Sequence, residues 1–176
     1  TIEQLLFFYH ELVCDHFGSD VNSKSTRDVV TQIIIPVTRD DECCWIDLPG
    51  WENRTSGATV THVVHAWGMR YVDTMQAVLL HASNGERREF GATLGESLSI
   101  FGEHRHKRYW LCPFCINQHT SMCTEVTCPC TSPKYDESSP WCEFNKFEEV
   151  ARRIHGKGGD MMVALDRNMT PFNRVW

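Results

Sequence analysis

The sequence lacks the features that would assign it to a membrane, to a nucleic acid or to the secretory route. No apolar run approaches the roughly 18 residues that a membrane-spanning helix needs. The 17 Lys and Arg residues are outnumbered by 23 Asp and Glu residues, for a formal net charge of −6, and no basic face for nucleic acid is evident. The N-terminus has no charged segment followed by an apolar one, as a signal peptide would. We therefore expect a protein of the cytoplasm or another reducing intracellular compartment, with no membrane span and no nucleic-acid partner.

The composition indicates one soluble globular domain. The chain has 176 residues, of which 41% are hydrophobic and 23% charged, which is long enough to bury a core. Six Trp, nine Phe and four Tyr residues are too many for a disordered chain. Because the first residue is Thr1 and not Met, we expect a processed product or a piece of a longer chain.

Cysteine is the residue type that stands out. The chain has nine cysteines, an odd number that cannot be fully paired within one chain, and six of them lie between positions 112 and 142. Such crowding in a chain without a secretion signal favours metal or redox chemistry over disulfide stapling.

Hydrophobic periodicity predicts alternating helices and strands. We expect helices over 1–17, from Ser25 to Pro36, over 71–82 and over 139–156. We expect strands over 58–65, 109–114 and 160–165, a mostly irregular segment over 38–58 with a short extended piece at 43–46, and irregular connections over 83–107 and 116–139. The order of strands and helices from residue 58 onward predicts an α/β fold, a parallel sheet flanked by helices.

Ligands of parallel α/β sheets bind beyond the carboxyl ends of the strands. In this chain those ends carry polar or special residues: His65, Trp67 and Gly68 after the first strand, Asn117, Gln118 and His119 after the second, and Asp166 and Arg167 after the third. An imidazole, an indole and amides suit a nucleotide-like ligand. The alternative is that these residues are polar only because the chain emerges into water, and that Trp67 caps the sheet.

Two stretches and the C-terminal segment resemble a known family. Thr61-His62-Val63-Val64-His65-Ala66-Trp67-Gly68, then the helix from Tyr71, then Tyr109-Trp110-Leu111-Cys112-Pro113-Phe114-Cys115-Ile116-Asn117-Gln118-His119, resemble the strand-end motifs S-H-x-W and N-Q-H of TIR-like domains from algae and protists. Pro171-Phe172-Asn173-Arg174-Val175-Trp176 is similar to that family's F-x-R-x-W segment. With the segments from Ser25 to Val30 and from Ile35 to Thr38, the resemblance covers about residues 25–176.

The resemblance implies a flavodoxin-like, TIR-like domain over 58–176, preceded by an N-terminal extension over 1–57. It implies a signalling or assembly role, with protein partners or self-association, and binding or hydrolysis of NAD in a cleft formed by His65, Trp67, Gly68, Asn117 and Asp166. The chain departs from the family by having Val64 where the motif has Ser, and by ending at Trp176, before the Cys and Glu of the motif. A catalytic glutamate for NAD cleavage therefore cannot be assigned within the sequence.

The loop over 116–139 predicts a structural zinc site. Cys123, Cys128, Cys130 and Cys142 offer four thiolates, and His119 is a substitute ligand. Tetrahedral sulfur and nitrogen ligands hold zinc, and the metal orders loops that have few apolar residues. The alternatives are unliganded thiols or disulfides. A bound zinc ion would favour a second function, that of a non-catalytic, zinc-stabilised interaction subunit of a larger complex.

Cys112-Pro113-Phe114-Cys115 also resembles the dithiol of glutaredoxin-type proteins, which gives a third function, thiol–disulfide exchange through Cys112 and Cys115. A redox dithiol needs its first cysteine at a helix N-terminus, where the helix dipole lowers the thiol pKa. The β-like residues 109–111 before the pair and the absence of an amphipathic helix after it favour cysteine packed as a small apolar residue.

Overall fold

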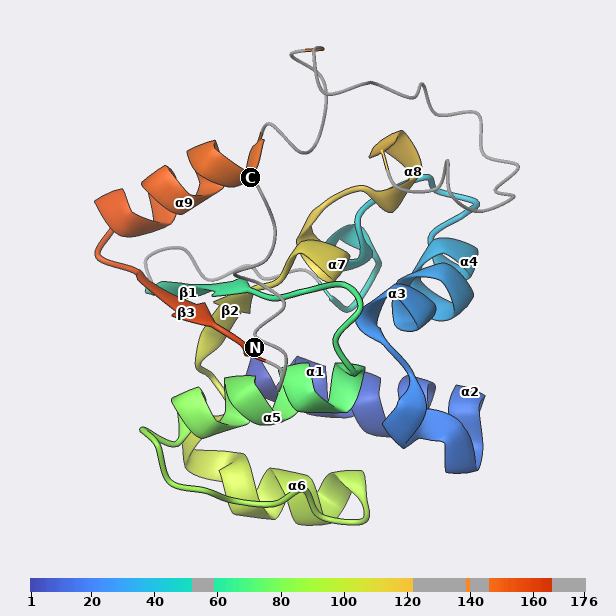
Figure 1. Ribbon diagram of the computed structural model, residues 1–176, viewed down its shortest axis with the longest axis vertical. Helices are drawn as coiled ribbons and strands as arrows, with labels where there is room; N and C mark the ends of the chain where they lie inside the picture. The colour runs from blue at the N-terminus through green and yellow to red at the C-terminus, as the bar shows by residue number, and fades with distance from the viewer. Residues whose placement is uncertain (52–58, 122–138, 140–145, 166–176) are drawn as a thin grey trace. The chain divides into compact units, whose positions relative to one another are not determined.

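The computed structural model describes residues 1–51, 59–121, 139 and 146–165. Figure 1 shows a mixed α/β chain. Its strands are β1 Val60–Val64, β2 Arg108–Trp110 and β3 Asp160–Val163. Its α-helices are α1 Ile2–Phe7, α2 Cys14–Phe17, α3 Thr26–Val29, α4 Ile35–Val37, α5 Tyr71–Ala82, α6 Leu94–Phe101, α7 Cys112–Cys115, α8 Gln118–Ser121 and α9 Lys146–Gly156. Among the described residues, no helix is long and apolar enough to cross a membrane.

The three strands form one parallel sheet in the order β2-β1-β3, flanked by helices. This confirms the predicted α/β class and the parallel sheet. The second strand is shorter than predicted, because it ends at Trp110 and the chain enters α7 at Cys112. Pro113 explains the difference, since proline lacks the N–H that a sheet needs and is favoured in the first turn of a helix.

The chain divides into two compact units. Unit 1 comprises Thr1–Val29, Val63–Tyr109 and the described residues from Met162 onward. Unit 2 comprises the described residues of Val30–His62 and Trp110–Met161.

The N-terminal helix confirms the amphipathic pattern predicted for 1–17. It consists of α1, a π-helical stretch Phe8–Val13 (η1) and α2, and Gly18 ends it with a positive φ of 53°. Thr1 and Gln4 close a capping box at its start. Its apolar side chains are buried: Ile2, Leu5, Leu6, Phe8, Tyr9 and Val13.

The second predicted helix begins as expected and ends later. The Ser25 hydroxyl accepts a hydrogen bond from the Asp28 backbone N–H at 3.2 Å, and the Asp28 carboxylate accepts one from the Ser25 N–H at 2.8 Å. The helix then passes through a π-helical stretch, Val30–Ile34 (η3), into α4, which ends at Val37. Pro36 therefore does not stop it; a widened π turn before the proline is one of the known ways in which a helix accommodates the ring.

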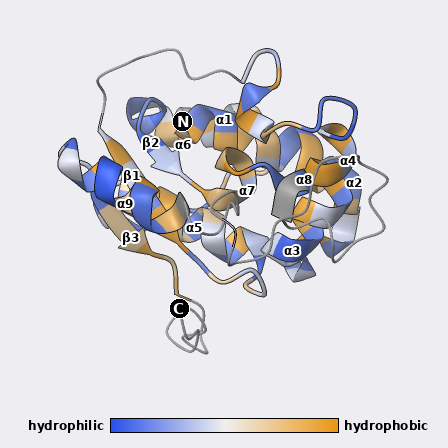
Figure 2. Cartoon of the chain, turned by 90° about the horizontal axis from the view of Figure 1, so that it is seen from above, coloured by the Kyte–Doolittle hydropathy of each residue, from blue (hydrophilic) through white to orange (hydrophobic). Residues whose placement is uncertain are grey.

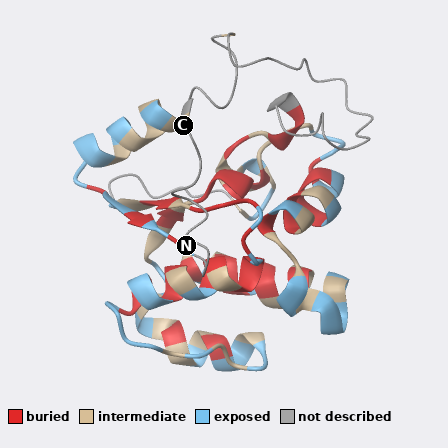
Figure 3. Cartoon of the chain, viewed as in Figure 1, coloured by how far each residue is buried: buried red, intermediate tan, exposed pale blue. Residues whose placement is uncertain are grey.

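The core of unit 1 lies between α1–η1 and α5. Tyr71 of α5 packs edge-on against Phe8 and parallel to Tyr9, with ring centroids 6.1 and 6.4 Å apart. The buried face of α5 is continuous along the helix (Figure 3): Tyr71, Val72, Thr74, Met75, Val78, Leu79 and Ala82. Between α5 and β2 the chain forms α6, which was predicted only as an irregular connection; Thr93 and Glu96 cap it.

Several aromatic side chains of unit 2 contact one another. Trp45 begins a 3₁₀ turn, Trp45–Asp47 (η4), so the extended piece predicted at 43–46 is wrong for residues 45–46, whereas Cys44 is extended. The Trp45 indole packs edge-on against Phe114 of α7. Trp110 contacts His62 on one side and Phe147 of α9 on the other. Charged residues dominate α9 (Figure 2), where Arg152 and Arg153 pair with Glu148 and Glu149.

The Ser25–Asp28 box makes a stability prediction that depends on pH. Burial favours the neutral carboxyl, but hydrogen bonds from the Ser25 side chain and backbone outweigh it and lower the pKa of Asp28 below its ordinary 3.8. The ionised box therefore stabilises the fold above that value, and the stabilisation is lost as the pH falls through the lowered pKa. We expect Ser25→Ala to reduce the free energy of unfolding by about 1 kcal/mol at pH 7 and by less at pH 3.

Urea unfolding at the two pH values measures this difference. Ser19→Ala is the control, because Ser19 is exposed and no hydrogen bond of its side chain is found in the described part of the chain. An equal loss at both pH values would show that the cap does not depend on the Asp28 charge.

Candidate functional site

The residues predicted at the end of β1 divide into two buried side chains and one exposed glycine. His65 and Trp67 are buried, and the Trp67 side chain leaves only 8% of the residue accessible. The Trp67 carbonyl accepts a hydrogen bond from the Arg27 N–H at 3.0 Å. Gly68 is exposed. Burial of the indole therefore favours the packing interpretation of Trp67 over ligand stacking.

The side chains of Asn117, Gln118 and His119 make hydrogen bonds with backbone and hydroxyl groups of unit 2. The Asn117 amide donates to the Glu42 carbonyl at 2.6 Å, and its oxygen accepts from the His119 N–H at 2.9 Å. Gln118 is buried and donates to the carbonyls of Cys112, Pro113 and Ile116. His119 is 0% exposed, and its Nε2 lies 2.9 Å from the Thr38 hydroxyl, which donates to the Ile34 carbonyl. These contacts give all three side chains structural roles.

The remaining predicted site residues lie outside the described part of the chain. They are Asp166 and the zinc candidates Cys123, Cys128, Cys130 and Cys142. Within the described ranges, no group of three or more His, Cys, Asp or Glu side chains is placed to hold a metal ion. His119, the substitute ligand, is engaged by Thr38. The zinc site stays a prediction.

The Cys112/Cys115 pair occupies a short helix and not the strand expected there. Cys112 is the first residue of α7 and is buried, and the Cys44 thiol lies 3.7 Å from the Cys115 carbonyl oxygen. Burial raises the pKa of Cys115 to about 11. Since only the thiolate attacks a disulfide, this pKa opposes a redox role for Cys115 at neutral pH.

A groove in unit 1 begins at Gly68, and we call it the Gly68 groove. It has a volume of about 790 Å³. Gly68 and Met69, which follow β1, line it together with Leu165, which follows β3. The Ala164 N–H donates to the Val64 carbonyl at 2.8 Å, so the carboxyl ends of these two strands lie side by side. The groove is therefore at the edge of the sheet where ligands of α/β folds bind.

The second wall of the groove is the exposed face of α5. Arg70, Asp73, Gln76 and Leu80 line it, three or four residues apart as neighbours on a helix surface are. The Arg70 guanidinium donates two hydrogen bonds of 2.7 Å to the Asp73 carboxylate. This bidentate pair neutralises both groups within the groove wall.

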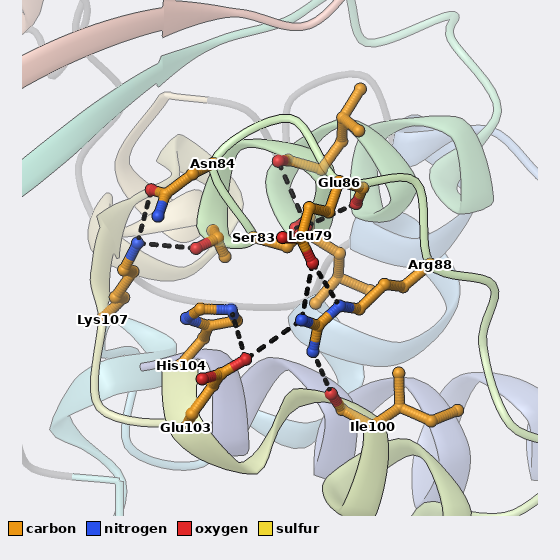
Figure 4. A network of polar contacts seen from close by, with 11 residues as sticks. Leu79, Ser83, Asn84, Glu86, Arg88, Ile100, Glu103, His104 and Lys107 are labelled. Carbon is orange, nitrogen blue, oxygen red and sulfur yellow. Dashed lines mark hydrogen bonds and ion pairs between the residues drawn. The ribbon is translucent and has the colours of Figure 1, made fainter.

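The third wall is the segment 87–89, and Arg88 holds it in place. The Arg88 guanidinium donates to the Ile100 carbonyl at 2.8 Å and pairs with Glu86 and Glu103 at 2.7 and 3.0 Å (Figure 4). Arg87 and Glu89 flank it and line the groove. Neither has a hydrogen-bond or ion-pair partner among the described residues.

The far end of this segment is held by the N-terminal helix. The Phe90 ring stacks on Tyr9 with centroids 4.9 Å apart. The Gly91 N–H donates to the Ser97 hydroxyl, which lies 2.9 Å from His10 Nε2. Burial lowers the pKa of His10, against the opposing effect of Glu11 and Glu96, so the imidazole is neutral at pH 7. A side chain at Gly91 would overlap Glu96, which requires glycine there.

The groove is locally more cationic than the chain. Three guanidinium groups and two carboxylates line it, whereas the whole chain carries a net charge of −6. Its volume is within the roughly 300–1,000 Å³ of small-molecule sites. An exposed, unpaired guanidinium binds phosphate or carboxylate through paired N–H donors. The arrangement can therefore hold an anionic ligand of nucleotide size.

Sequence reasoning found one residue of this groove, Gly68, and missed the others. Asp73, Gln76 and Leu80 could have been found on the predicted helix 71–82, away from its apolar stripe, whereas Arg70 precedes that helix. Arg87 and Glu89 carried no signal, because they lie in a connection without periodicity. Only tertiary contacts bring this connection to the end of β1.

Comparison of the chain with protein-family models, with curated proteins and with solved structures gives no match. The TIR-like resemblance of residues 61–68 and 109–119 stays a prediction.

The buried Thr38–His119 contact gives a test of the structural role of His119. Thr38→Val keeps the volume and removes the hydroxyl, which leaves a buried imidazole nitrogen without this partner. We expect a loss of about 1–3 kcal/mol in the free energy of unfolding. Thermal or urea unfolding measures it, with the exposed Val37→Thr as the control. An unchanged stability would contradict the structural role and leave His119 available as a ligand.

Proposed function

We propose that the chain is a TIR-like signalling or assembly domain of flavodoxin-like architecture, and that its Gly68 groove binds a nicotinamide dinucleotide or a similar anionic nucleotide. The observation that carries the binding proposal is Arg87, an unpartnered guanidinium in a groove at the carboxyl ends of two parallel strands. This observation involves only residues that line the groove.

The sheet supports the architectural part of the proposal. A flavodoxin-like sheet begins with the strand order 2-1-3, and the described strands have the order β2-β1-β3. The order reverses at β1, and in such sheets the crevice beside the reversal is where a nucleotide binds. Gly68 follows β1, so the groove has the position that this architecture predicts for a ligand.

The chemistry of the walls supports the ligand class. A dinucleotide is anionic at its pyrophosphate, and Arg87 is the guanidinium of the groove that does not have to break an ion pair to meet it. Gln76 offers an amide, and Leu80 and Leu165 offer apolar surface for a ring. The proposal is one of binding.

Replacement of Arg87 tests the proposal. We expect Arg87→Gln to weaken the binding of oxidised NAD by about tenfold, because a charge-assisted hydrogen bond to a phosphate is lost. Isothermal titration calorimetry at low ionic strength measures the dissociation constant. Arg105→Gln is the matched control, since it removes the same charge from an exposed site of unit 1 outside the groove. No binding by the unaltered chain, or equal loss in both variants, would refute the groove as the site.

A second candidate function, the zinc-stabilised interaction subunit, is favoured by apolar side chains left exposed at the end of β3. Val163 and Leu165 are 37% and 45% exposed, and Leu80 is 43% exposed. Parallel sheets are usually covered on both faces, and clustered exposed apolar side chains are typical of interaction sites. This function requires neither Arg87 nor a nucleotide.

Metal analysis of the purified chain tests the zinc component. We expect about one equivalent of zinc, and loss of the metal by a chelator should lower the unfolding temperature, because metal binding and loop ordering are coupled. Cys123→Ser should reduce the zinc content, whereas Cys14→Ser in the N-terminal helix should not. Less than about a tenth of an equivalent would exclude the zinc site.

A further inference from the structure

Arg87 and Glu89 are two opposite charges on the same wall of the Gly68 groove. Arg88 stands between them, and its guanidinium is directed to Ile100, Glu86 and Glu103 (Figure 4). Because Arg87 and Glu89 are two residues apart in the chain, their Cα atoms are at most about 7 Å apart. Both side chains that flank Arg88 line the groove.

The other charged groups of the groove are already neutralised. Arg70 and Asp73 form a bidentate pair, and Arg88 is held by two carboxylates and a carbonyl. Arg87 and Glu89 have no partner among the described residues, and they do not pair with each other. The groove thus offers one cationic and one anionic side chain, a short distance apart, to whatever enters it.

We propose that the Gly68 groove selects zwitterionic ligands, with Arg87 holding an anionic group and Glu89 a cationic group, and that it therefore binds the oxidised nicotinamide dinucleotide more tightly than the reduced one. The inference rests on the proposed function. It specifies the feature of the ligand that the groove recognises, which is its pair of opposite charges. In the oxidised dinucleotide a single ribose joins the cationic pyridinium ring to the nearest phosphate. In the reduced form the ring is neutral and the phosphates are unchanged.

The physical basis is the difference of one charge between two otherwise similar ligands. A carboxylate about 4 Å from a cation in a solvent-exposed site gains about as much as a fivefold change in affinity. The same carboxylate repels the phosphates of both forms equally. Glu89 therefore sets the ratio of the two affinities, whereas Arg87 affects both affinities alike.

Titration of the full chain with each form of the dinucleotide tests the inference. Tryptophan fluorescence or calorimetry at one fixed ionic strength gives both dissociation constants. We expect the unaltered chain to favour the oxidised form by about fivefold, and Glu89→Gln to bring the two affinities within about twofold of each other. Glu3→Gln, which removes an exposed carboxylate of α1 outside the groove, should keep the preference. Arg87→Gln should weaken both forms and also keep it.

Each of the other outcomes of this titration shows which part of the proposal is wrong. A preference that survives Glu89→Gln, or equal affinities in the unaltered chain, refutes the role of Glu89 and leaves the binding proposal intact. Binding of neither form refutes the proposed function, and the charge selection with it. A preference lost equally in Glu3→Gln shows a general effect of net charge and refutes a local one.

Discussion

Parallel pairing of β1 with β3 is the constraint on which the Gly68 groove depends. The hydrogen bond from the Ala164 N–H to the Val64 carbonyl joins two strands that are distant in the sequence. It brings Leu165 beside the turn that carries Gly68 and Met69. Without this pairing the groove would lose Leu165, because its other residues come from the turn after β1, from α5 and from the connection that follows α5.

The Gly68 groove also requires that the connection after α5 is held in place by contacts with other elements. Arg88 uses its guanidinium to tie this segment to Ile100 and Glu103, at the junction of α6 and the turn after it. Phe90 and Gly91 tie its other end to the N-terminal helix and to Ser97. Arg88 is engaged in this way, whereas Arg87 and Glu89, which also line the groove, have no hydrogen-bond or ion-pair partner among the described residues. A structural ion pair thus determines which charges remain available for a ligand.

The residues that resemble the TIR-like motifs have structural explanations within the described part of the chain. In unit 2, Asn117, Gln118 and His119 make hydrogen bonds with carbonyl and hydroxyl groups of the same unit. In unit 1, Trp67 fills the core below the turn that exposes Gly68. The fold alone therefore accounts for these residues. A ligand-binding function has to be supported by the residues of the Gly68 groove.

The sequence alone determined the elements with strong periodicity: the helix over 1–17, the helix over 71–82, the strand at 60–64 and the last strand. The two helices bury a continuous apolar stripe, and burial of such a stripe outweighs local alternatives. The two strands were indicated by short runs of apolar and β-branched residues, although Met162 is the only buried residue of β3. Local signals without a stripe were insufficient, so α6 was missed and residues 112–114 were assigned to a strand, whereas they lie in α7. Only the tertiary structure decided where the charged side chains of 87–89 point, because their directions depend on partners in α6 and the N-terminal helix that no local pattern specifies.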